Sequence, residues 1–211
     1  MDLAVLFSPE EFVKLKEYLV LYRCALINMT TRMEILLEDF VNLQGYNPIE
    51  HVKYRLKTNE SIAAKLHRQN LDLTADNARK HLTDICGVRC ICPYTKDIAY
   101  LAKVLKSQSD LKIVSEKDYI TKPKPSGYRS YHMILEVPIY LSDTEERLPV
   151  EIQIRTQAMD FWATLEHKAR YKYQDEMPEH LAHDLNECAV KIAELDDRMS
   201  LIQDLVNIAY D

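Results

Sequence analysis

Glycine is scarce in this chain of 211 residues, which contains only Gly45, Gly87 and Gly127. None of the three is followed by lysine or by a second glycine within two residues. The glycine-rich phosphate loops of Walker A proteins and of dinucleotide-binding βαβ units are therefore absent. If the protein binds nucleotide phosphates, it does so with lysine, arginine and a metal ion instead of a glycine-lined backbone.

Long apolar runs and an export signal are also lacking. No run approaches the roughly 20 apolar residues needed to cross a bilayer, and the first residues do not begin a basic-then-apolar signal peptide. Five cysteines, an odd number, are more typical of reduced thiols than of a disulfide framework. We therefore expect a cytoplasmic protein that does not associate with a membrane.

The composition is that of a globular protein with an uneven charge. Apolar residues make up 47% of the chain and charged residues 28%, which excludes a disordered or fibrous protein. The net charge of -6 hides a pattern: residues 1–50 carry 4 basic and 8 acidic side chains, residues 174–211 carry 2 and 10, and residues 51–173 carry 21 and 15. The basic centre favours an anion-binding core between acidic helical ends, although an ordinary charged surface would give the same count.

Helices are predicted at both ends of the chain. Ser8-Pro9 followed by two glutamates supplies an N-cap, a proline at the first helical position and acids in the first turn. Apolar residues at three- and four-residue steps then predict two helical stretches up to about residue 43. Another helix is predicted from about residue 178, with an apolar stripe that packs either on the protein's own core or on another subunit.

Between these ends, short β-rich runs alternate with helical patterns. The predicted strands are residues 51–57, 85–92, 111–120, 131–140 and 147–155. The predicted helices are residues 59–69, 74–82, 96–106 and 158–173. The pattern indicates an α/β (α+β) fold with a mixed sheet, divided into an N-terminal helical extension, a core and a C-terminal helix at residues 1–46, 47–173 and 174–211.

A first group of polar residues surrounds the start of a predicted helix. Arg55 and Lys57 precede it, and Ser61, Lys65 and Arg68 lie on one of its faces at i, i+4 and i+7. Cations that share a face repel each other unless an anion lies between them, and a triphosphate is such an anion. A solvated helix face is the alternative explanation.

A second group is centred on Asp84, at the mouth of an apolar strand that also carries Arg89. A carboxylate there needs a charged partner or a metal, so Asp84 is a candidate Mg²⁺ ligand, with a helix cap or a salt bridge as the alternative. Alternation places Asp84 and Arg89 on opposite faces of the strand. If both serve one site, Asp84 must precede the strand or Gly87 must form a bulge.

A third group lies in a loop that two prolines stiffen. The loop presents Lys122 and Lys124, and Gly127 permits a turn that places Tyr128 beside Arg129. An aromatic ring next to cations suits a nucleotide, because the ring stacks on a base while lysines hold its phosphates. A loop aromatic that packs on the core is the alternative.

A fourth group alternates along a predicted strand, where Glu151, Gln153 and Arg155 share the polar face. This face meets either solvent or a site. The following helix adds four polar residues at i, i+4, i+7 and i+11 that could close the same cleft: Asp160, Thr164, His167 and Tyr171.

In this order and combination, the four groups resemble the synthetase domain of the RelA/SpoT family over residues 47–173. Asn47-Pro48-Ile49-Glu50-His51, ahead of the first group, resembles a RelP-type small alarmone synthetase. The resemblance implies a nucleotidyltransferase-like mixed sheet flanked by helices. It also implies a GTP diphosphokinase of the stringent response, which transfers pyrophosphate from ATP to the ribose 3′-hydroxyl of GDP or GTP, makes (p)ppGpp and releases AMP.

The resemblance further implies roles for individual residues. Arg55 and Arg89 would bracket the adenine of ATP. Its phosphates would be held by Lys57, Ser61, Lys65 and Arg68. Asp84 and Glu151 would bind Mg²⁺, and Glu151 would also take the 3′-hydroxyl proton. The guanine nucleotide would be contacted by Tyr128, stacked on the base, and by Lys117, Lys124, Ser126, His132, Gln153 and Asp160.

Other functions remain open from the sequence. Asp160 stands where some relatives have Asn, which leaves the preference between acceptors undecided. One alternative is a toxin-like relative that pyrophosphorylates tRNA or an adenine nucleotide, and another is a catalytically silent sensor of nucleotides or an RNA-binding regulator. Small relatives are commonly homotetramers, so we expect a homotetramer without an obligate nucleic-acid partner.

Overall fold

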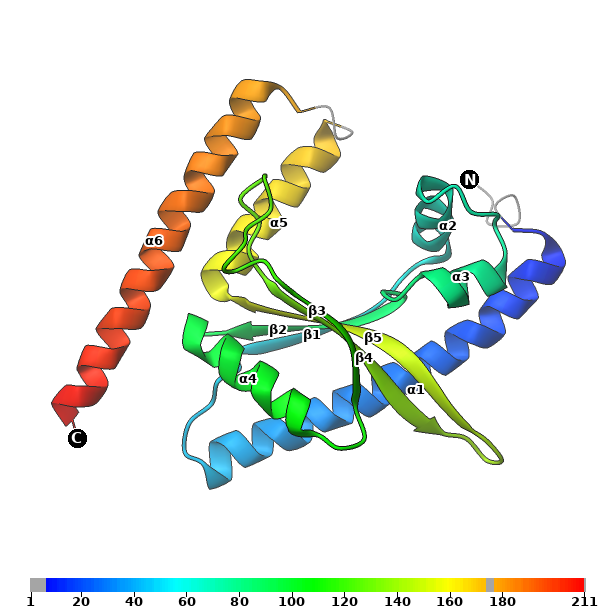
Figure 1. The fold of residues 1–211 in the computed structure, drawn as a ribbon, viewed down its shortest axis with the longest axis horizontal. Helices are drawn as coiled ribbons and strands as arrows, with labels where there is room; N and C mark the ends of the chain where they lie inside the picture. Colours follow the sequence, from blue (N-terminus) through cyan, green and yellow to red (C-terminus); the bar gives the residue numbers. More distant parts are fainter. Residues whose placement is uncertain (1–6, 174–176, 211) are drawn as a thin grey trace.

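A five-stranded mixed sheet forms the centre of the computed structural model, which describes residues 7–173 and 177–210 (Figure 1). The strands are β1 His51–Leu56, β2 Cys86–Cys92, β3 Lys112–Asp118, β4 Tyr131–Tyr140 and β5 Glu145–Thr156. Their order in the sheet is β1-β2-β5-β4-β3. β2 and β5 pair in parallel, whereas the other neighbouring strands are antiparallel. The predicted mixed sheet with flanking helices is confirmed.

Alternation along the central strands separates a core face from a polar face. On β5, Val150, Ile152 and Ile154 are fully buried, while Glu151 and Gln153 point to the opposite face. β2 and β4 continue the same apolar rows, because their buried residues pair with those of β5. The polar face is therefore free to hold the site while the other face builds the core.

The long helix α1, Pro9–Glu38, packs on the core side of the sheet (Figure 1). Ser8 caps it, since its Oγ accepts from the Glu11 backbone N–H at 3.3 Å. Two helical stretches were predicted here, but the structure has one 30-residue helix that continues as a π-helical segment, Asp39–Leu43. The polar residues between the two apolar runs do not break the helix, because Thr30 bonds to the Leu26 carbonyl and Asn28 to the Pro138 carbonyl.

The remaining helices are α2 Asn59–Arg68, α3 Ala75–His81, α4 Thr95–Ser107, α5 Gln157–Lys172 and α6 Glu179–Tyr210. In Figure 1, α4 lies on the same side of the sheet as α1, and α5 and α6 run side by side at one end of it. Each helix begins within about two residues of its predicted start. None of the described helices combines the length and the apolar character that crossing a membrane requires.

The apolar stripe of α6 is used in two ways. Its first half packs on the protein's own core, where Ala189 is buried and the Leu185 carbonyl accepts from Trp162 Nε1 at 3.0 Å. Its second half is uncovered in the chain, with Leu195 58% and Leu205 66% exposed. Packing on the protein's own core is therefore confirmed for the first half, and packing of the second half on another subunit stays a prediction. The division into three segments stays a prediction, and parts of the terminal segments, residues 1–6, 174–176 and 211, lie outside the described residues.

Candidate functional site

Two neighbouring rows of residues cross the polar face of the sheet, and they hold much of the predicted site. In strand order β1-β2-β5-β4-β3, the first row is Arg55, Gly87, Glu151, Ile134 and Ser115. The second row is Lys53, Arg89, Gln153, His132 and Lys117. Strand register therefore brings together residues that are far apart in the sequence, because paired residues on one face lie about 5 Å from each other.

A cavity of about 240 Å³ opens over the β1 and β2 end of these rows. Its lining includes both arginines predicted to bracket a base, Arg55 and Arg89, together with Glu151 and Gln153. Arg89 is half-buried, and burial lowers the pKa of its guanidinium, with the nearby charge of Arg155 adding to that effect. Two planar guanidinium groups beside one cavity suit an aromatic base.

A second cavity, of about 630 Å³, lies along α2. Four residues of the first polar group line it: Arg55, Lys57, Ser61 and Arg68. His67 and His167 line it as well. This is a basic surface with a hydroxyl donor, as anionic phosphates require.

A third cavity, of about 270 Å³, covers the β3 and β4 end of the rows. Its polar lining is Lys65, Thr83, Asp84, Ser115, Lys117, Tyr119, Lys124, His132 and Glu151. Both candidate metal ligands, Asp84 and Glu151, therefore face one cavity. Glu151 lines the first cavity too, so its carboxylate stands between the two spaces.

Asp84 lies in the loop just before β2, which removes the conflict between its direction and that of Arg89. Its Oδ2 accepts from Lys57 Nζ at 2.6 Å and lies 2.7 Å from Lys65 Nζ. Burial alone would raise the pKa of Asp84, but the hydrogen bonds and charges of both lysines outweigh burial and hold the pKa below its ordinary value.

The donor set around Asp84 fits a magnesium ion. Oδ1 of Asp84 is buried and has no hydrogen-bond partner, which leaves one carboxylate oxygen available to a cation. Within residues 7–173 and 177–210, no cluster of three or more His, Cys, Asp and Glu side chains suits a metal. Mg²⁺ commonly takes one or two carboxylates and completes its shell with substrate phosphates and water, so two protein ligands suffice.

Glu151 is held by donors on both sides. Gln153 Nε2 donates to its Oε2 at 2.8 Å, and His132 Nδ1 lies 3.5 Å from its Oε1. Burial would raise the pKa of Glu151, but His132 and Gln153 outweigh burial and lower the pKa, so the carboxylate is ionised at neutral pH. Gly87 leaves room beside it, because a Cβ there would lie 3.2 Å from the Glu151 carbonyl oxygen.

Three aromatic rings lie together beside the third cavity, and two of them, Tyr119 and His132, line it. The rings of Tyr119, Tyr128 and His132 meet edge to face, with centroids 5.3 to 6.1 Å apart. Lys124 Nζ lies 4.8 Å from the centroid of Tyr119 and 4.7 Å from that of Tyr128. An aromatic wall next to cations is what the third polar group predicted.

Comparison with known proteins identifies the family. Residues 54–176 match the family model described as the region found in RelA / SpoT proteins. The chain belongs to the RelA/SpoT family. It is 43% identical to GTP pyrophosphokinase YwaC of Bacillus subtilis over 202 residues, which cover 94% of this chain and 96% of that protein. The assignment to the RelP type within the family stays a prediction.

Solved structures of the RelA/SpoT family have the same fold. Small alarmone synthetase 2 of Bacillus subtilis superimposes with a TM-score of 0.82 at 44% identity, covering 90% of this chain and 97% of that chain. Small alarmone synthetase 1 of Bacillus subtilis, bound to its product pppGpp, superimposes with a TM-score of 0.84 at 34% identity and the same coverage.

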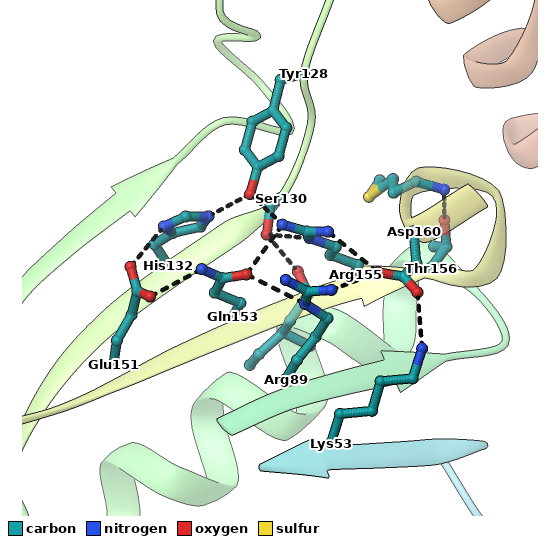
Figure 2. Close-up of polar contacts among 12 residues, drawn as sticks. Lys53, Arg89, Tyr128, Ser130, His132, Glu151, Gln153, Arg155, Thr156 and Asp160 are labelled. Atoms are coloured by element: carbon teal, nitrogen blue, oxygen red, sulfur yellow. Dashed lines mark hydrogen bonds and ion pairs between the residues drawn. The ribbon is translucent and has the colours of Figure 1, made fainter. Parts of the chain in front are cut away.

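Four of the seven residues that the RelA/SpoT resemblance placed around the guanine nucleotide do not line the third cavity: Tyr128, Ser126, Gln153 and Asp160. Gln153 lines the first cavity, and Tyr128 meets the rings of Tyr119 and His132, which line the third. Asp160, at the start of α5, contacts three cations instead: Arg155 at 3.1 Å, Arg89 at 3.3 Å and Lys53 at 3.4 Å (Figure 2). Ser126 is half-buried in the turn before Gly127 and lines none of the three cavities described above. Their predicted roles stay predictions.

Several residues of the RelA/SpoT site were not assigned from the sequence. Tyr119, Lys53 and His67 had no assigned role, yet each lines a cavity. His167 was predicted only as part of a polar helix face that closes the cleft, and it lines the second cavity. Arg155 was recognised only as part of a polar strand face, whereas the structure buries it between Gln153, Tyr128 and Asp160. Alternation showed the face on which Arg155 lies, but not that this face is covered at that point.

Proposed function

We propose that this protein is a (p)ppGpp synthetase, which transfers pyrophosphate from ATP to the ribose 3′-hydroxyl of GDP or GTP and releases AMP. The observation that carries the proposal is the place of Glu151, whose side chain lines both the cavity with Arg55 and Arg89 and the cavity with Lys117 and Lys124. A base between a donor and an acceptor nucleotide is what this reaction needs. Membership of a family that includes GTP pyrophosphokinases supports the same activity.

In this proposal ATP occupies the first two cavities. Arg55 and Arg89 bracket its adenine, and its phosphates meet Lys57, Ser61 and Arg68 of the second cavity. Lys65, which lines the third cavity beside Asp84, reaches the same phosphates in this proposal. Lys57 and Lys65 both contact Asp84. Phosphate oxygens would replace that carboxylate as their partners, which fits a site where binding is an exchange of charge partners.

The guanine nucleotide occupies the third cavity in this proposal. Tyr128, whose ring meets those of Tyr119 and His132 beside the cavity, stacks on the base. Lys117, Lys124 and His132 line the cavity and lie toward the phosphates and sugar. Glu151 accepts the proton of the 3′-hydroxyl as the 3′-oxygen bonds to the β-phosphorus of ATP. The bond between the β-phosphorus and its bridging oxygen to the α-phosphate breaks, and AMP leaves with that oxygen.

Mg²⁺ is the proposed cofactor, with Asp84 and Glu151 as its protein ligands. When bound, it would neutralise charge on the transferred phosphates. The residues themselves position the two nucleotides and receive the proton, and no covalent nucleophile is needed.

A labelling experiment tests the proposed activity and its acceptor. ATP labelled in its γ-phosphate is offered with GDP, GTP, ATP or tRNA in separate reactions, and products are identified by mass. We expect label in guanosine tetra- or pentaphosphate with one AMP released per product. Label in tRNA or an adenine nucleotide would assign the toxin-like activity, and tight GTP binding without AMP release would assign a silent sensor.

We also propose that the protein is a homotetramer in the cytoplasm, without a membrane or obligate nucleic-acid partner. Besides the uncovered half of α6, helix α1 exposes Val13, Val20 and Ile27 at seven-residue spacing, each 57 to 59% exposed. Two apolar faces on opposite ends of the chain provide two kinds of contact, which a dimer of dimers uses. A monomeric mass by light scattering at micromolar concentration would contradict this.

A further inference from the structure

The buried side chain of Arg155 donates hydrogen bonds to four other side chains. Its side chain is 5% exposed, and each nitrogen of its guanidinium has a partner. Nη2 donates to Tyr128 Oη at 2.5 Å and to Gln153 Oε1 at 2.9 Å. Nη1 donates to Asp160 Oδ1 at 3.1 Å, and Nε to Ser130 Oγ at 3.4 Å. One planar guanidinium thus contacts four side chains, those of Tyr128, Gln153, Asp160 and Ser130.

The first path from Arg155 runs through a tyrosine and a histidine to Glu151 (Figure 2). Tyr128 Oη lies 2.8 Å from His132 Nε2, and His132 Nδ1 lies 3.5 Å from Glu151 Oε1. Arginine only donates, so the Tyr128 oxygen accepts from it and directs its own proton to Nε2 of His132. A neutral His132 then carries its proton on Nδ1, facing Glu151.

The second path runs through Gln153. Its Oε1 accepts from Arg155 and, at 3.3 Å, from Arg89 Nε. This fixes the orientation of the amide, because only its Nε2 remains to donate to Glu151 Oε2 at 2.8 Å. The two paths reach different oxygens of the same carboxylate.

Together the contacts form a closed ring of five side chains: Arg155, Tyr128, His132, Glu151 and Gln153. We propose that Arg155 is a positioning residue for Glu151, because it sets the direction of both paths and so holds the carboxylate toward the 3′-hydroxyl. This rests on the proposed role of Glu151 as the base. Arg155 itself does not line any of the three substrate cavities described above.

The substitution Arg155→Lys separates positioning from charge. Lysine keeps the positive charge beside Asp160 but lacks the planar fork, so it cannot hold Tyr128 and Gln153 together. The Gln153 amide and the Tyr128 hydroxyl are then free to reorient. A misplaced catalytic group lowers turnover by roughly 10- to 100-fold. Because the cations of the ATP cavities are unchanged, we expect kcat to fall by that factor with KM for ATP within about 2-fold.

The matched control is Arg32→Lys, which removes another half-buried arginine fork. Arg32 bonds to Gln108 and Asp110, away from the three cavities. We expect both variants to lower the melting temperature but only Arg155→Lys to lower kcat. Equal kcat values for the two variants would overturn the proposal, because a purely structural arginine would act like Arg32.

Two further measurements address the paths themselves. Nitrogen NMR of the His132 ring reports the Nδ1–H tautomer in the unaltered protein and a mixture in Arg155→Lys, if the first path is directed as described. In a double-mutant cycle with Tyr128→Phe, the combined loss in kcat is smaller than the product of the single losses. An unchanged tautomer or fully multiplicative losses would reject the ring.

If Arg155→Lys does not fold, a second variant tests the same proposal. Tyr128→Phe removes one hydroxyl from the ring and must by itself lower kcat and alter the His132 tautomer. Glu151→Gln separates this inference from the proposed function. If Glu151→Gln removes activity while Arg155→Lys behaves like Arg32→Lys, only the positioning role fails; if Glu151→Gln stays active, the proposed base itself is wrong.

Discussion

The two sides of Glu151 hold their positive charges in different ways. On the ATP side, Lys57 and Lys65 are paired with a carboxylate, that of Asp84. On the guanine-nucleotide side, Lys124 lies over the rings of Tyr119 and Tyr128. A lysine in an ion pair can exchange its carboxylate for a phosphate. The attraction between a lysine and an aromatic ring instead depends on where the ring lies.

The two sides also rest on different secondary-structure elements. The ATP side rests on β1 and α2, at one edge of the sheet. The guanine-nucleotide loop is backed by α6, where Asn186 Nδ2 donates to the Pro125 carbonyl at 2.8 Å and Ala189 packs against Gly127. We therefore expect changes on the ATP side to act through charge, and changes on the other side to act through shape.

The largest effect is expected from the residue that the two sides share. Glu151→Gln keeps the shape and the neighbours of the side chain but removes the base and one magnesium ligand, so turnover should fall about 100-fold or more. Steady-state kinetics measures this, with Glu136→Gln on β4 as the control, since Glu136 pairs with Lys112 outside the site. Near-normal turnover of the folded variant would reject the proposed role.

Asp84→Asn tests a carboxylate that pairs with the lysines of the ATP side and also lines the third cavity, without being one of the residues assigned to the guanine nucleotide. The amide keeps a hydrogen-bond acceptor for Lys57 but loses the charge that binds a cation, so turnover should also fall about 100-fold or more. Binding of GDP in the absence of ATP, measured by calorimetry, should change less than about 2-fold. Asp76→Asn is the control, because Asp76 pairs with Lys14 on the surface. A similar loss of GDP affinity would show that the two sides are not separable.

The sequence predicted the face of each central strand well, and for a physical reason. Alternation on β5 separates Glu151 and Gln153 from buried Ile152 whichever strand lies beside it. It does not reveal that β2 pairs with β5 in the register that places Gly87 opposite Glu151. The composition of the rows that cross the sheet depends on such long-range pairing, which residue types do not encode locally.

Two further differences have local causes. The structure has one helix where two were predicted for α1. The side chains of Asn28 and Thr30 donate hydrogen bonds to the carbonyls of Pro138 and Leu26, so they do not interrupt the helix backbone. Arg155 was missed because its strand position indicates only a polar face. The covering residues Tyr128 and Asp160 come from a loop and a helix whose placement the alternation does not specify.

Gly127→Ala tests the guanine-nucleotide side through shape. The backbone at Gly127 has φ +86°, and a Cβ there would lie 2.5 Å from the Cβ of Ala189. Strain and overpacking together should lower the melting temperature by about 5–10 °C. The displaced loop should raise KM for the guanine nucleotide roughly 10-fold, the effect of losing ~1.4 kcal/mol of binding, while KM for ATP changes little.

Two variants separate the strain from the overpacking in Gly127→Ala. Gly45→Ala imposes a similar backbone strain at φ +70° but meets nothing within 4 Å, so it should lose stability without changing either KM. Adding Ala189→Gly to Gly127→Ala removes the clash and should restore most of the affinity for the guanine nucleotide. If the double variant keeps the high KM, α6 does not shape the loop.

The smallest effect is expected at Asp196, a residue of α6 that bonds to the end of β5 behind the guanine-nucleotide loop. Its Oδ2 accepts from Thr156 Oγ1 at 2.6 Å, and burial raises the pKa of this carboxyl above its ordinary value of 3.8. A raised pKa means that the ionised form costs stability; the cost is absent below about pH 3.8 and appears as the pH rises through the folded-state pKa. Asp196→Asn keeps an acceptor for Thr156 without the charge, so it should raise the melting temperature by on the order of 2 °C at pH 7.

The gain in melting temperature should vanish near pH 4 and be absent in Asp197→Asn, whose side chain is exposed. A loss of stability at pH 7 would instead show that attraction to Arg129 outweighs the cost of burial, and that charge, not only shape, holds α6 behind the guanine-nucleotide side.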